Sequence, residues 1–434
     1  MSEQRVSYLK VLRNRNFATL WGGQIVSQIG DSFNWLAMLI TVERLTGSTV
    51  AMGFMAISLT LPQLLFGMLA GVLVDRFDRR RTMIVSDVLR GLVVLLCLLV
   101  QTPEQVPLFY GVGFTLSTFS TLFFPAKNAV IPLILPEQDL LAANALSQST
   151  QVAALIVGST LAGVLVGQLG AAPAFVIDSL TFFVSAGAIW LMTIPATVRA
   201  AAVSSNAASA AFQDLVEGLR FIGGSRIVLG MTLVISIVQL GLGAINTLWV
   251  PLMSRYLGMG PEAIGAVDAA QGIGMIVGAA ILGLLATHLR KTWLVNLGLM
   301  VIGLGIAAMG LIPAVPGQGT SLIAGTVGFW LVWISTLVLG VAVTPAVSTV
   351  NTIIQLVVPD AMMGRVNSTV GTLGSVAMLA SMAGAAILGD LIGIPTVYVV
   401  CGLVVVGAGV VGVIALEEPT TREVPVPLPI KASE

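Results

Sequence analysis

The sequence predicts an all-α integral membrane protein with 12 transmembrane helices, built as two six-helix parallel repeats (6+6) around a central cavity. Three observations lead to this prediction: an apolar composition, twelve long apolar segments, and matching residues in the two halves. Of the 434 residues, 56% are hydrophobic and only 9% are charged. Soluble domains carry about 25% charged residues, so this chain cannot cover a water-facing surface. The composition excludes soluble enzymes, nucleic-acid-binding proteins and disordered proteins.

Twelve segments are long and apolar enough to cross a bilayer, for which a helix needs about 20 residues. They are much longer than the roughly ten alternating residues of a barrel strand. The first segment carries polar side chains and has no small-residue cleavage site after it, so we expect a permanent span rather than a signal peptide. The expected spans are 17–41, 49–74, 82–100, 108–126, 142–168, 171–194, 227–253, 263–286, 293–313, 322–344, 367–389 and 395–416.

Lys and Arg residues are concentrated on one side of this arrangement. Seventeen of the 20 lie in segments on the side of the termini, and only Arg44 and Arg255 lie on the other side. Basic loops stay in the cytoplasm. We therefore expect a multi-pass protein of the plasma (cytoplasmic) membrane with both termini cytoplasmic.

The two halves carry similar residues at matching positions. Gln24 and Asp31 are seven residues apart in the first span, as Gln239 and Asn246 are in the seventh. The other matched positions are Pro125-Ala126 with Pro345-Ala346 at the ends of spans, and Pro136 and Asn144 with Pro359 and Asn367. Repeats of this kind let a transporter build a central site between two halves that rock against each other.

We divide the chain at its polar stretches. The expected parts are an N-terminal six-helix half at 1–194, a cytoplasmic linker at 195–226, a C-terminal six-helix half at 227–416 and a disordered tail at 417–434. Within the linker, residues 200–211 are rich in Ala and Ser and are expected to be flexible. Apolar residues of 212–222 recur at helical spacing, which predicts a short helix along the membrane interface.

The loop between the second and third spans carries a recognisable motif. It reads Gly71-Val-Leu-Val-Asp75-Arg76-Phe-Asp78-Arg79-Arg80-Arg81. This resembles the signature loop of the major facilitator superfamily, with Asp78 where Gly is usual. The resemblance implies a twelve-helix transporter that works by alternating access. It also implies that Gly71, Asp75, Arg76, Arg79 and Arg80 latch the two halves together on the cytoplasmic side in the outward-open state. The alternative is that these basic residues only keep the loop in the cytoplasm.

Further stretches resemble the macrolide and enterobactin exporter branch of that superfamily, which is of the drug–proton antiporter type. They are Gln28-Ile-Gly-Asp31, Phe124-Pro-Ala-Lys-Asn128, Pro136-Glu-Gln-Asp-Leu-Leu-Ala-Ala-Asn144 and Phe175-Val-Ile-Asp178-Ser. In the fifth span, Gly158-Ser-Thr-Leu-Ala-Gly163 resembles the antiporters' Gly-Pro-x-x-Gly-Gly motif, with Ser159 in place of Pro.

The sequence contains no nucleotide-binding loop, and its longest polar stretch is too short for a nucleotide-binding domain. An ion gradient is therefore the expected energy source, and a carboxylate inside the membrane is the usual device. Asp31 is the first candidate, because Gln24, Gln28 and Asp31 share one helical face in the first span. The alternative for Asp31 is a structural carboxylate bonded to a neighbouring helix.

Other charged and amide side chains inside the spans are further candidates for functional residues. Asp87 and Arg90 are spaced i, i+3 and are expected to pair, either to fasten helix ends or to take part in coupling. Asp178 and Asp268 are expected near the outer face, as gate contacts or as shallow solvated carboxylates. Asp268 would join the expected cavity set, which consists of Asp31, Gln24, Gln28, Gln239, Asn246 and Asp268.

The predicted function is secondary active export of amphiphilic or hydrophobic small molecules, macrolide- or drug-like, by proton-coupled alternating access. The alternatives are a lysophospholipid or lipid translocator and a siderophore exporter of the same fold. No nucleophile–base pair and no metal-ligand spacing occurs, so we expect neither an enzyme nor a metal or other cofactor. The expected partners are a small-molecule substrate, protons and the lipid bilayer, with no nucleic acid, and the default oligomeric state is a monomer.

Overall fold

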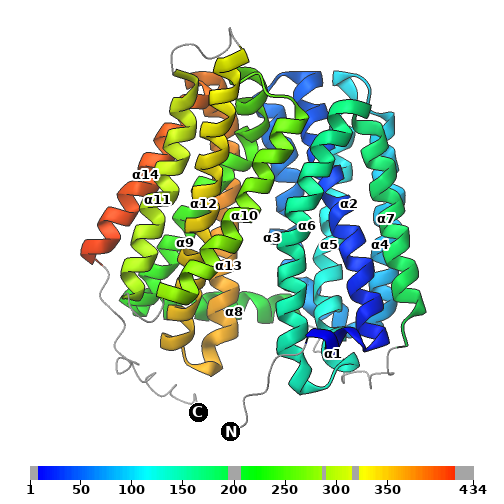
Figure 1. The fold of residues 1–434 in the computed structure, drawn as a ribbon. Coiled ribbons are helices and arrows are strands. Elements are labelled where there is room, and N and C mark those ends of the chain that lie inside the picture. The colour runs from blue at the N-terminus through cyan, green and yellow to red at the C-terminus, as the bar shows by residue number, and fades with distance from the viewer. Residues whose placement is uncertain (1–7, 194–206, 286–289, 315–321, 416–434) are drawn as a thin grey trace.

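The computed structural model describes residues 8–193, 207–285, 290–314 and 322–415. In this part of the chain, twelve helices are long and apolar enough to cross a membrane, as the sequence predicts. Figure 1 shows them running side by side. They are α2 (Arg15–Thr46), α3 (Thr49–Arg76), α4 (Arg79–Val94) together with the turn η1 (Leu95–Leu99) that continues it, α5 (Val106–Ile134), α6 (Leu140–Leu169), α7 (Ala171–Leu191), α9 (Arg226–Pro251), α10 (Pro261–Leu285), α11 (Lys291–Leu311), α12 (Leu322–Val357), α13 (Asp360–Ile392) and α14 (Ile394–Ala415).

Shorter elements connect or extend these helices. They are α1 (Tyr8–Leu12), α8 (Ala207–Gly224), the 3₁₀ turns η1 (Leu95–Leu99), η2 (Pro103–Gln105), η3 (Glu137–Asp139) and η5 (Ile312–Ala314), and the π-helical turn η4 (Leu252–Tyr256). Both α1 and α8 lie at the lower end of the molecule in Figure 1. We call this the α8 end and the opposite one the far end.

The six helices of each half form one bundle, and the contacts within the first bundle recur in the second. In the first, α4 packs on α7 and α5, α2 packs on α6 and α7, and α3 packs on α5. The equivalent contacts in the second join α11 to α14 and α12, α9 to α13 and α14, and α10 to α12. The predicted pair of parallel six-helix repeats is therefore confirmed.

Two helices run eight residues or more beyond the C-terminal ends that their apolar segments predict. The sequence predicts ends at residues 126 and 344, but α5 continues to Ile134 and α12 to Val357. Pro125 and Pro345, expected at the ends of these spans, lie inside the helices instead. The apolar pattern stops where the helix leaves the bilayer core, whereas the backbone hydrogen bonds continue beyond it.

The two bundles touch mainly near the far end. There α6 packs on α10 and α3 packs on α13. The α6–α10 contact depends on glycines that face each other: a Cβ added at Gly265 would lie 2.2 Å from the Ser159 carbonyl oxygen and 3.0 Å from Gly163 Cα. Small residues allow such close backbone approach between membrane helices. In the α3–α13 contact, the Thr49 hydroxyl donates to the Ala386 carbonyl at 2.6 Å.

The helix α8 begins at Ala207, so its first five residues, 207–211, belong to the stretch that the sequence analysis expects to be flexible. It is bound to the second bundle: Arg365 of α13 pairs with Asp214 at 2.8 Å and with Glu217 at 2.5 Å. Gly218 is buried against Thr369 of α13. Apolar side chains of α8 remain exposed, namely Phe212, Val216 and Leu219. An amphipathic helix with such a face fits the membrane interface.

Candidate functional site

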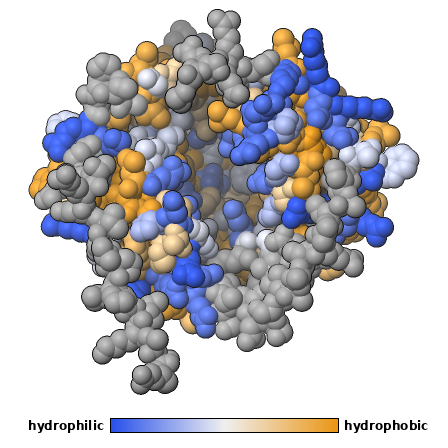
Figure 2. Space-filling model, turned by 90° about the horizontal axis from the view of Figure 1, so that it is seen from below, coloured by the Kyte–Doolittle hydropathy of each residue, from blue (hydrophilic) through white to orange (hydrophobic). Residues whose placement is uncertain are grey.

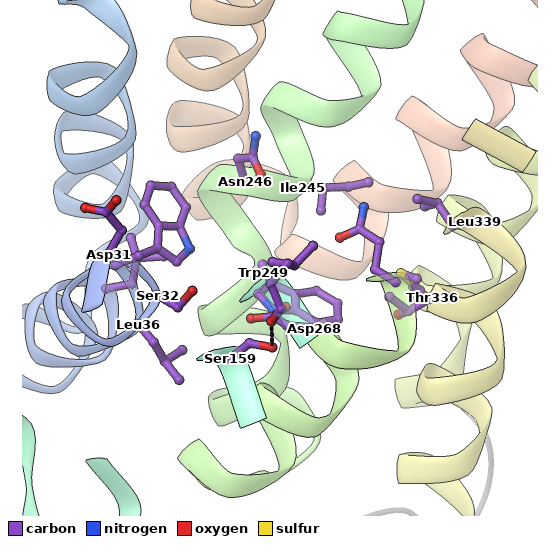
Figure 3. Close-up of a pocket in the computed structure, with 15 residues that line it drawn as sticks. Asp31, Ser32, Leu36, Ser159, Ile245, Asn246, Trp249, Asp268, Thr336 and Leu339 are labelled. Carbon is purple, nitrogen blue, oxygen red and sulfur yellow. Dashed lines mark hydrogen bonds between the residues drawn. The ribbon is translucent and has the colours of Figure 1, made fainter. Parts of the chain in front are cut away.

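A cavity of about 470 Å³ lies between the two bundles and receives side chains from both. Figure 3 shows Asp31 and Ser32 of α2 on one side and Trp249 and Asp268 of the second bundle on the other. The lining residues are Asp31, Ser32, Trp35, Leu36, Leu39, Leu155, Ser159, Ile245, Asn246, Trp249, Asp268, Gln271, Met309, Thr336 and Leu339. Apolar side chains predominate, which is typical of small-molecule sites.

Two carboxylates face this cavity from opposite bundles. Asp31 of α2 is exposed to it, and Asp268 of α10 is half-buried beside the indole of Trp249. Within the described residues, neither carboxylate forms an ion pair. Of the predicted cavity set, the structure thus brings Asp31, Asp268 and Asn246 together around one space.

The first bundle adds a polar cavity of about 790 Å³, which shares Asp31, Ser32 and Leu155 with the central one. Predicted Gln28 lines it, together with the further amides Asn128, Asn144, Gln148 and Gln151. Lys127 also lines it, and its ammonium lies 4.9 Å from the centroid of the Phe124 ring. Figure 2, which views the molecule from the α8 end, shows the surface hollowed between the two bundles.

The second bundle has a corresponding cavity of about 470 Å³ between α9, α12 and α13. It contains predicted Gln239, whose amide contacts Met378 Sδ at 3.7 Å. Asn367 lines this cavity, and its counterpart in the repeat, Asn144, lines the polar cavity of the first bundle. None of the residues around this second cavity is charged.

Predicted Gln24 does not line the central cavity. It is buried, and its amide donates to the Ser185 hydroxyl of α7 at 3.2 Å. The shared helical face of the first span therefore turns gradually, so that Gln24 contacts α7 while Asp31 faces open space. A real helix has 3.6 residues per turn, which displaces residues seven apart by about 20°.

Behind Asp31, the first bundle contains a buried charged cluster. Asp87 and Arg90 of α4 form an ion pair and are 0% and 4% exposed. The guanidinium of Arg90 also donates to Ser120 at 3.2 Å and lies 4.8 Å from the Phe123 ring centroid. It lies 4.4 Å from the Phe182 ring on the other side, an arrangement favourable for a cation over aromatic faces.

The expectation that Asp178 is a shallow carboxylate or an outer-gate contact is wrong. Asp178 is 0% exposed and packs against α2 at Gly30. Its distance along α7 from the far end is modest, but α2 and α4 cover that side of α7. Depth along one helix does not report how its neighbours cover it.

In this conformation Arg79 and Arg80 of the signature loop bind carbonyl groups of their own bundle. Arg79 donates to the Ala129 carbonyl of α5 at 3.3 Å, and Arg80 donates to the Ile189 carbonyl at the end of α7 at 3.2 Å. Gly71 has open space around it. The side chains of Asp75 and Arg76 lie outside the described part of the structure.

Asp78, the residue that departs from the family pattern, has a local role. Its carboxylate accepts a hydrogen bond from the Arg81 backbone N–H at 2.8 Å and so caps the N-terminus of α4. Caps of this type satisfy an otherwise free helix donor.

The two glycines of the antiporter-like motif in α6 face different partners. A Cβ at Gly158 would lie 2.6 Å from the Ser32 hydroxyl of α2, within the first bundle. At Gly163 it would lie 2.6 Å from the Pro261 carbonyl of α10, across the interface between bundles. The motif thus allows close packing on both sides of α6.

Sequence reasoning did not identify several side chains of the site. Lys127 was counted as a topological charge and as part of the exporter-like stretch but was given no role in a cavity, and the indole of Trp249 was not singled out. The ion pair between Glu43 and Arg255 across the far end was also missed. Its one available signal was that Arg255 is one of only two basic residues on that side. In the described residues, no group of three or more His, Cys, Asp or Glu side chains could hold a metal ion.

Comparisons with known proteins agree with this architecture. The chain is 28% identical to the uncharacterised MFS-type transporter YfiS of Bacillus subtilis, over 92% of this chain and 93% of that protein. It is 25% identical to macrolide efflux protein A of Streptococcus pyogenes, over 91% and 94% of the two chains. Its fold is similar to that of the nucleoside transporter NupG, with a TM-score of 0.74 at 12% identity over 93% and 100% of the chains.

A family profile identifies the chain more specifically. The profile described as transmembrane secretion effector matches residues 6–424, which is nearly the whole chain. Together with the twelve helices and the repeated bundles, this match assigns the protein: it belongs to the transmembrane secretion effector family of major facilitator superfamily transporters, which are multi-pass membrane proteins and not enzymes.

Proposed function

We propose that this transporter exports amphiphilic or hydrophobic small molecules by proton-coupled alternating access. The observation that carries the proposal is the cavity that both bundles line, with Asp31 on one side and Asp268 on the other. Such a cavity is closed by contacts near the far end, and the surface is hollowed at the α8 end. A site between two rocking bundles is the arrangement that alternating access requires.

The α8 end faces the cytoplasm in this proposal. The excess of Lys and Arg on the side of the termini supports that orientation, as does the exposed apolar face of α8. The conformation described above is then open to the cytoplasm and can load a substrate. The protein would be a multi-pass component of the plasma membrane that works as a monomer, with both termini cytoplasmic.

The lining favours neutral or cationic amphiphiles over polyanions. Trp35 and Trp249 supply aromatic surface, and Asp31 and Asp268 supply negative charge that has no ion-pair partner among the described residues. Aromatic faces and carboxylates together attract organic cations. The similarity to a macrolide efflux protein supports large amphiphilic substrates of this kind.

Proton coupling is assigned to Asp31, because it faces both the central and the polar cavity. Protonation removes the charge of Asp31 and therefore lowers the free-energy cost of placing this side chain in an apolar environment. The loop residues Gly71, Asp75, Arg76, Arg79 and Arg80 would contact the second bundle when the α8 end closes, as the family resemblance implies.

The test is accumulation of a labelled macrolide and a cationic dye in cells that lack their own exporters. Cells producing the wild type, Asp31→Asn or the exposed control Glu137→Gln are compared with and without a protonophore. We expect the wild type and the control to lower accumulation, and the protonophore or Asp31→Asn to abolish this effect.

Two outcomes would contradict parts of the proposal. Export that survives Asp31→Asn would remove Asp31 from the coupling path. Accumulation equal to that of empty cells for both probes would contradict drug export, and a lipid or siderophore substrate would then be tested in the same cells.

A further inference from the structure

Asp178 lies in the core of the first bundle, pressed against the backbone of α2. A Cβ added at Gly30 would lie 2.7 Å from Asp178 Oδ1, so the carboxyl group occupies the space that this glycine leaves. The residue is 0% exposed, and neither the central nor the polar cavity is lined by it. A buried carboxyl group of this kind needs either hydrogen-bond donors or a cation if it is ionised.

The hydrogen-bond donors around Asp178 are few. The Thr181 hydroxyl lies 3.4 Å from Asp178 Oδ1, but it is only 2.7 Å from the Asp178 carbonyl oxygen, which is its better acceptor. Asp178 Oδ2 has no hydrogen-bond partner among the described residues. An ionised carboxylate would be left almost without hydrogen-bond donors here. The free-energy cost of burial is much smaller for a neutral carboxylic acid.

The charges nearby do not compensate for an ionised Asp178. The groups within electrostatic range are Asp31 of α2, Arg90 and its partner Asp87 of α4, and the Cys97 thiol of η1. Arg90 is the one cation in this group and already forms an ion pair with Asp87. That pair is neutral as a whole, and Asp31 adds a further acid rather than a base.

We propose that Asp178 is a second proton-binding site, which carries a proton in this conformation and exchanges it with the cavity through Asp31. Asp31 follows Gly30 directly in α2. Of the charged residues in this cluster, Asp31 is the one whose side chain lines the central and the polar cavity. Asp87 and Asp178 are 0% exposed and Arg90 is 4% exposed. The proton passes from the Asp178 carboxylic acid to the Asp31 carboxylate, and Asp31 then releases it to water in the cavity.

The same cluster can hold Asp178 after the proton has left. In this conformation Arg90 Nε is buried without a hydrogen-bond acceptor. A shift of the Arg90 side chain that accompanies the loss of the proton would let this group donate to the Asp178 carboxylate. Three acids then share one arginine. The claim that this proton movement drives export rests on the proposed function. The claim that Asp178 carries a proton in this conformation does not depend on it.

Infrared spectroscopy of the purified protein tests the site without any substrate. A protonated carboxyl group gives a C=O stretch above the amide I band, and this band shifts on exchange into D2O. At neutral pH we expect a band in the wild type that is retained in the exposed control Glu137→Gln but is missing in Asp178→Asn. If Asp178→Asn fails to fold, Thr181→Val provides the assignment. The Thr181 hydroxyl lies 3.4 Å from Asp178 Oδ1, so its loss should move the same band by a small amount and leave every other carboxyl band unchanged.

The route is tested by the rate of hydrogen–deuterium exchange of this band. A positioned acid–base group accelerates proton transfer by about a hundredfold or more, so Asp31→Asn should slow the exchange by about that factor. A wild-type spectrum with no band attributable to Asp178 would overturn the proton site. Exchange at the wild-type rate in Asp31→Asn would overturn the route through Asp31. Either result can occur whether or not the cells of the accumulation experiment export a drug.

Discussion

Arg255 reaches across the far end of the molecule to pair with Glu43 of the other bundle. Its guanidinium forms two hydrogen bonds to the carboxylate, and the Nη2–Oε2 distance is 2.6 Å. The Ser254 hydroxyl also lies 3.3 Å from Glu43 Oε1, although it is closer to the Val250 carbonyl oxygen, at 2.9 Å. Glu43 is 8% exposed and the Arg255 side chain is 30% exposed, so the pair is partly shielded from water. Opening of the far end has to separate these two residues.

Glu43→Gln should therefore favour the state that is open at the far end. A hydrogen bond to a charged group contributes roughly 1.5–3 kcal/mol, and about 1.4 kcal/mol corresponds to tenfold in the ratio of two states. Thr49 is 1% exposed and bonded across the same interface, which makes Thr49→Cys a reporter of opening. We expect about tenfold faster labelling of Thr49→Cys by a membrane-impermeant maleimide when Glu43→Gln is added.

The exchange of both charges is the control for this experiment. Glu43→Arg combined with Arg255→Glu restores opposite charges across the same interface and should return labelling toward the original rate. Equal labelling with and without Glu43→Gln would mean that the ion pair does not hold the far end closed.

Gly265→Ala should also loosen the far end, through sterics rather than charge. The added Cβ would lie 2.2 Å from the Ser159 carbonyl oxygen, and backbone on both sides leaves it no space. The expected result is faster labelling of Thr49→Cys and a lower thermal unfolding temperature. Gly187→Ala is the matched control, because Gly187 lies inside α7 with no other atom within 4 Å of an added Cβ. There the helix should gain up to about 1 kcal/mol from alanine.

Arg90→Ala should destabilise the first bundle strongly. Removal of one partner from a buried ion pair costs about 3–5 kcal/mol, because the other charge stays buried and unpaired. Combining Arg90→Ala with Asp87→Ala removes both charges and should be less harmful than the two single changes added together. Thermal unfolding of the purified variants, followed by fluorescence, measures this difference. Additive effects of the two changes would show that the pair contributes no coupling energy.

Asp268→Asn should weaken binding of a cationic dye by about tenfold, which corresponds to loss of about 1.4 kcal/mol of charge attraction. Binding of a neutral amphiphile of similar size should stay the same. Trp35 and Trp249 line the cavity, so quenching of tryptophan fluorescence can report both affinities. An equal loss of affinity for the two probes would indicate that Asp268 shapes the cavity instead of attracting charge.

The fold could be predicted from the sequence because independent features of the sequence indicated the same architecture. Twelve apolar segments, alternating basic loops and repeated motifs all required two six-helix units. The helices follow the predicted spans within a few residues, except at the ends of α5 and α12 and at the beginning of α13. In a bilayer every backbone polar group has to be satisfied within the helix, which makes apolar length a reliable guide.

The site was predictable only where one helix decides the outcome. Asp31 and Asp268 lie on the cavity because polar side chains in a spanning helix avoid lipid. Gln24 and Asp178 were misplaced because their surroundings depend on α7 and α2 packing against each other, which no single helix encodes. The pair of Glu43 and Arg255 joins residues 212 positions apart and becomes visible only in three dimensions.

The repeated contact pattern also has a consequence for how the two bundles have diverged. The helices equivalent to α4 and α7 are α11 and α14, and neither carries an acid at any position. The position of the buried charged cluster is thus occupied by uncharged side chains in the second bundle, and its cavity at Gln239 lacks charge as well. Under the proposed mechanism, the first bundle carries the proton coupling, and the second bundle is freer to vary in the shape of the cavity that it offers to a substrate. A chimera with a relative's second half should accordingly change which compounds are moved while retaining the same dependence on the ion gradient.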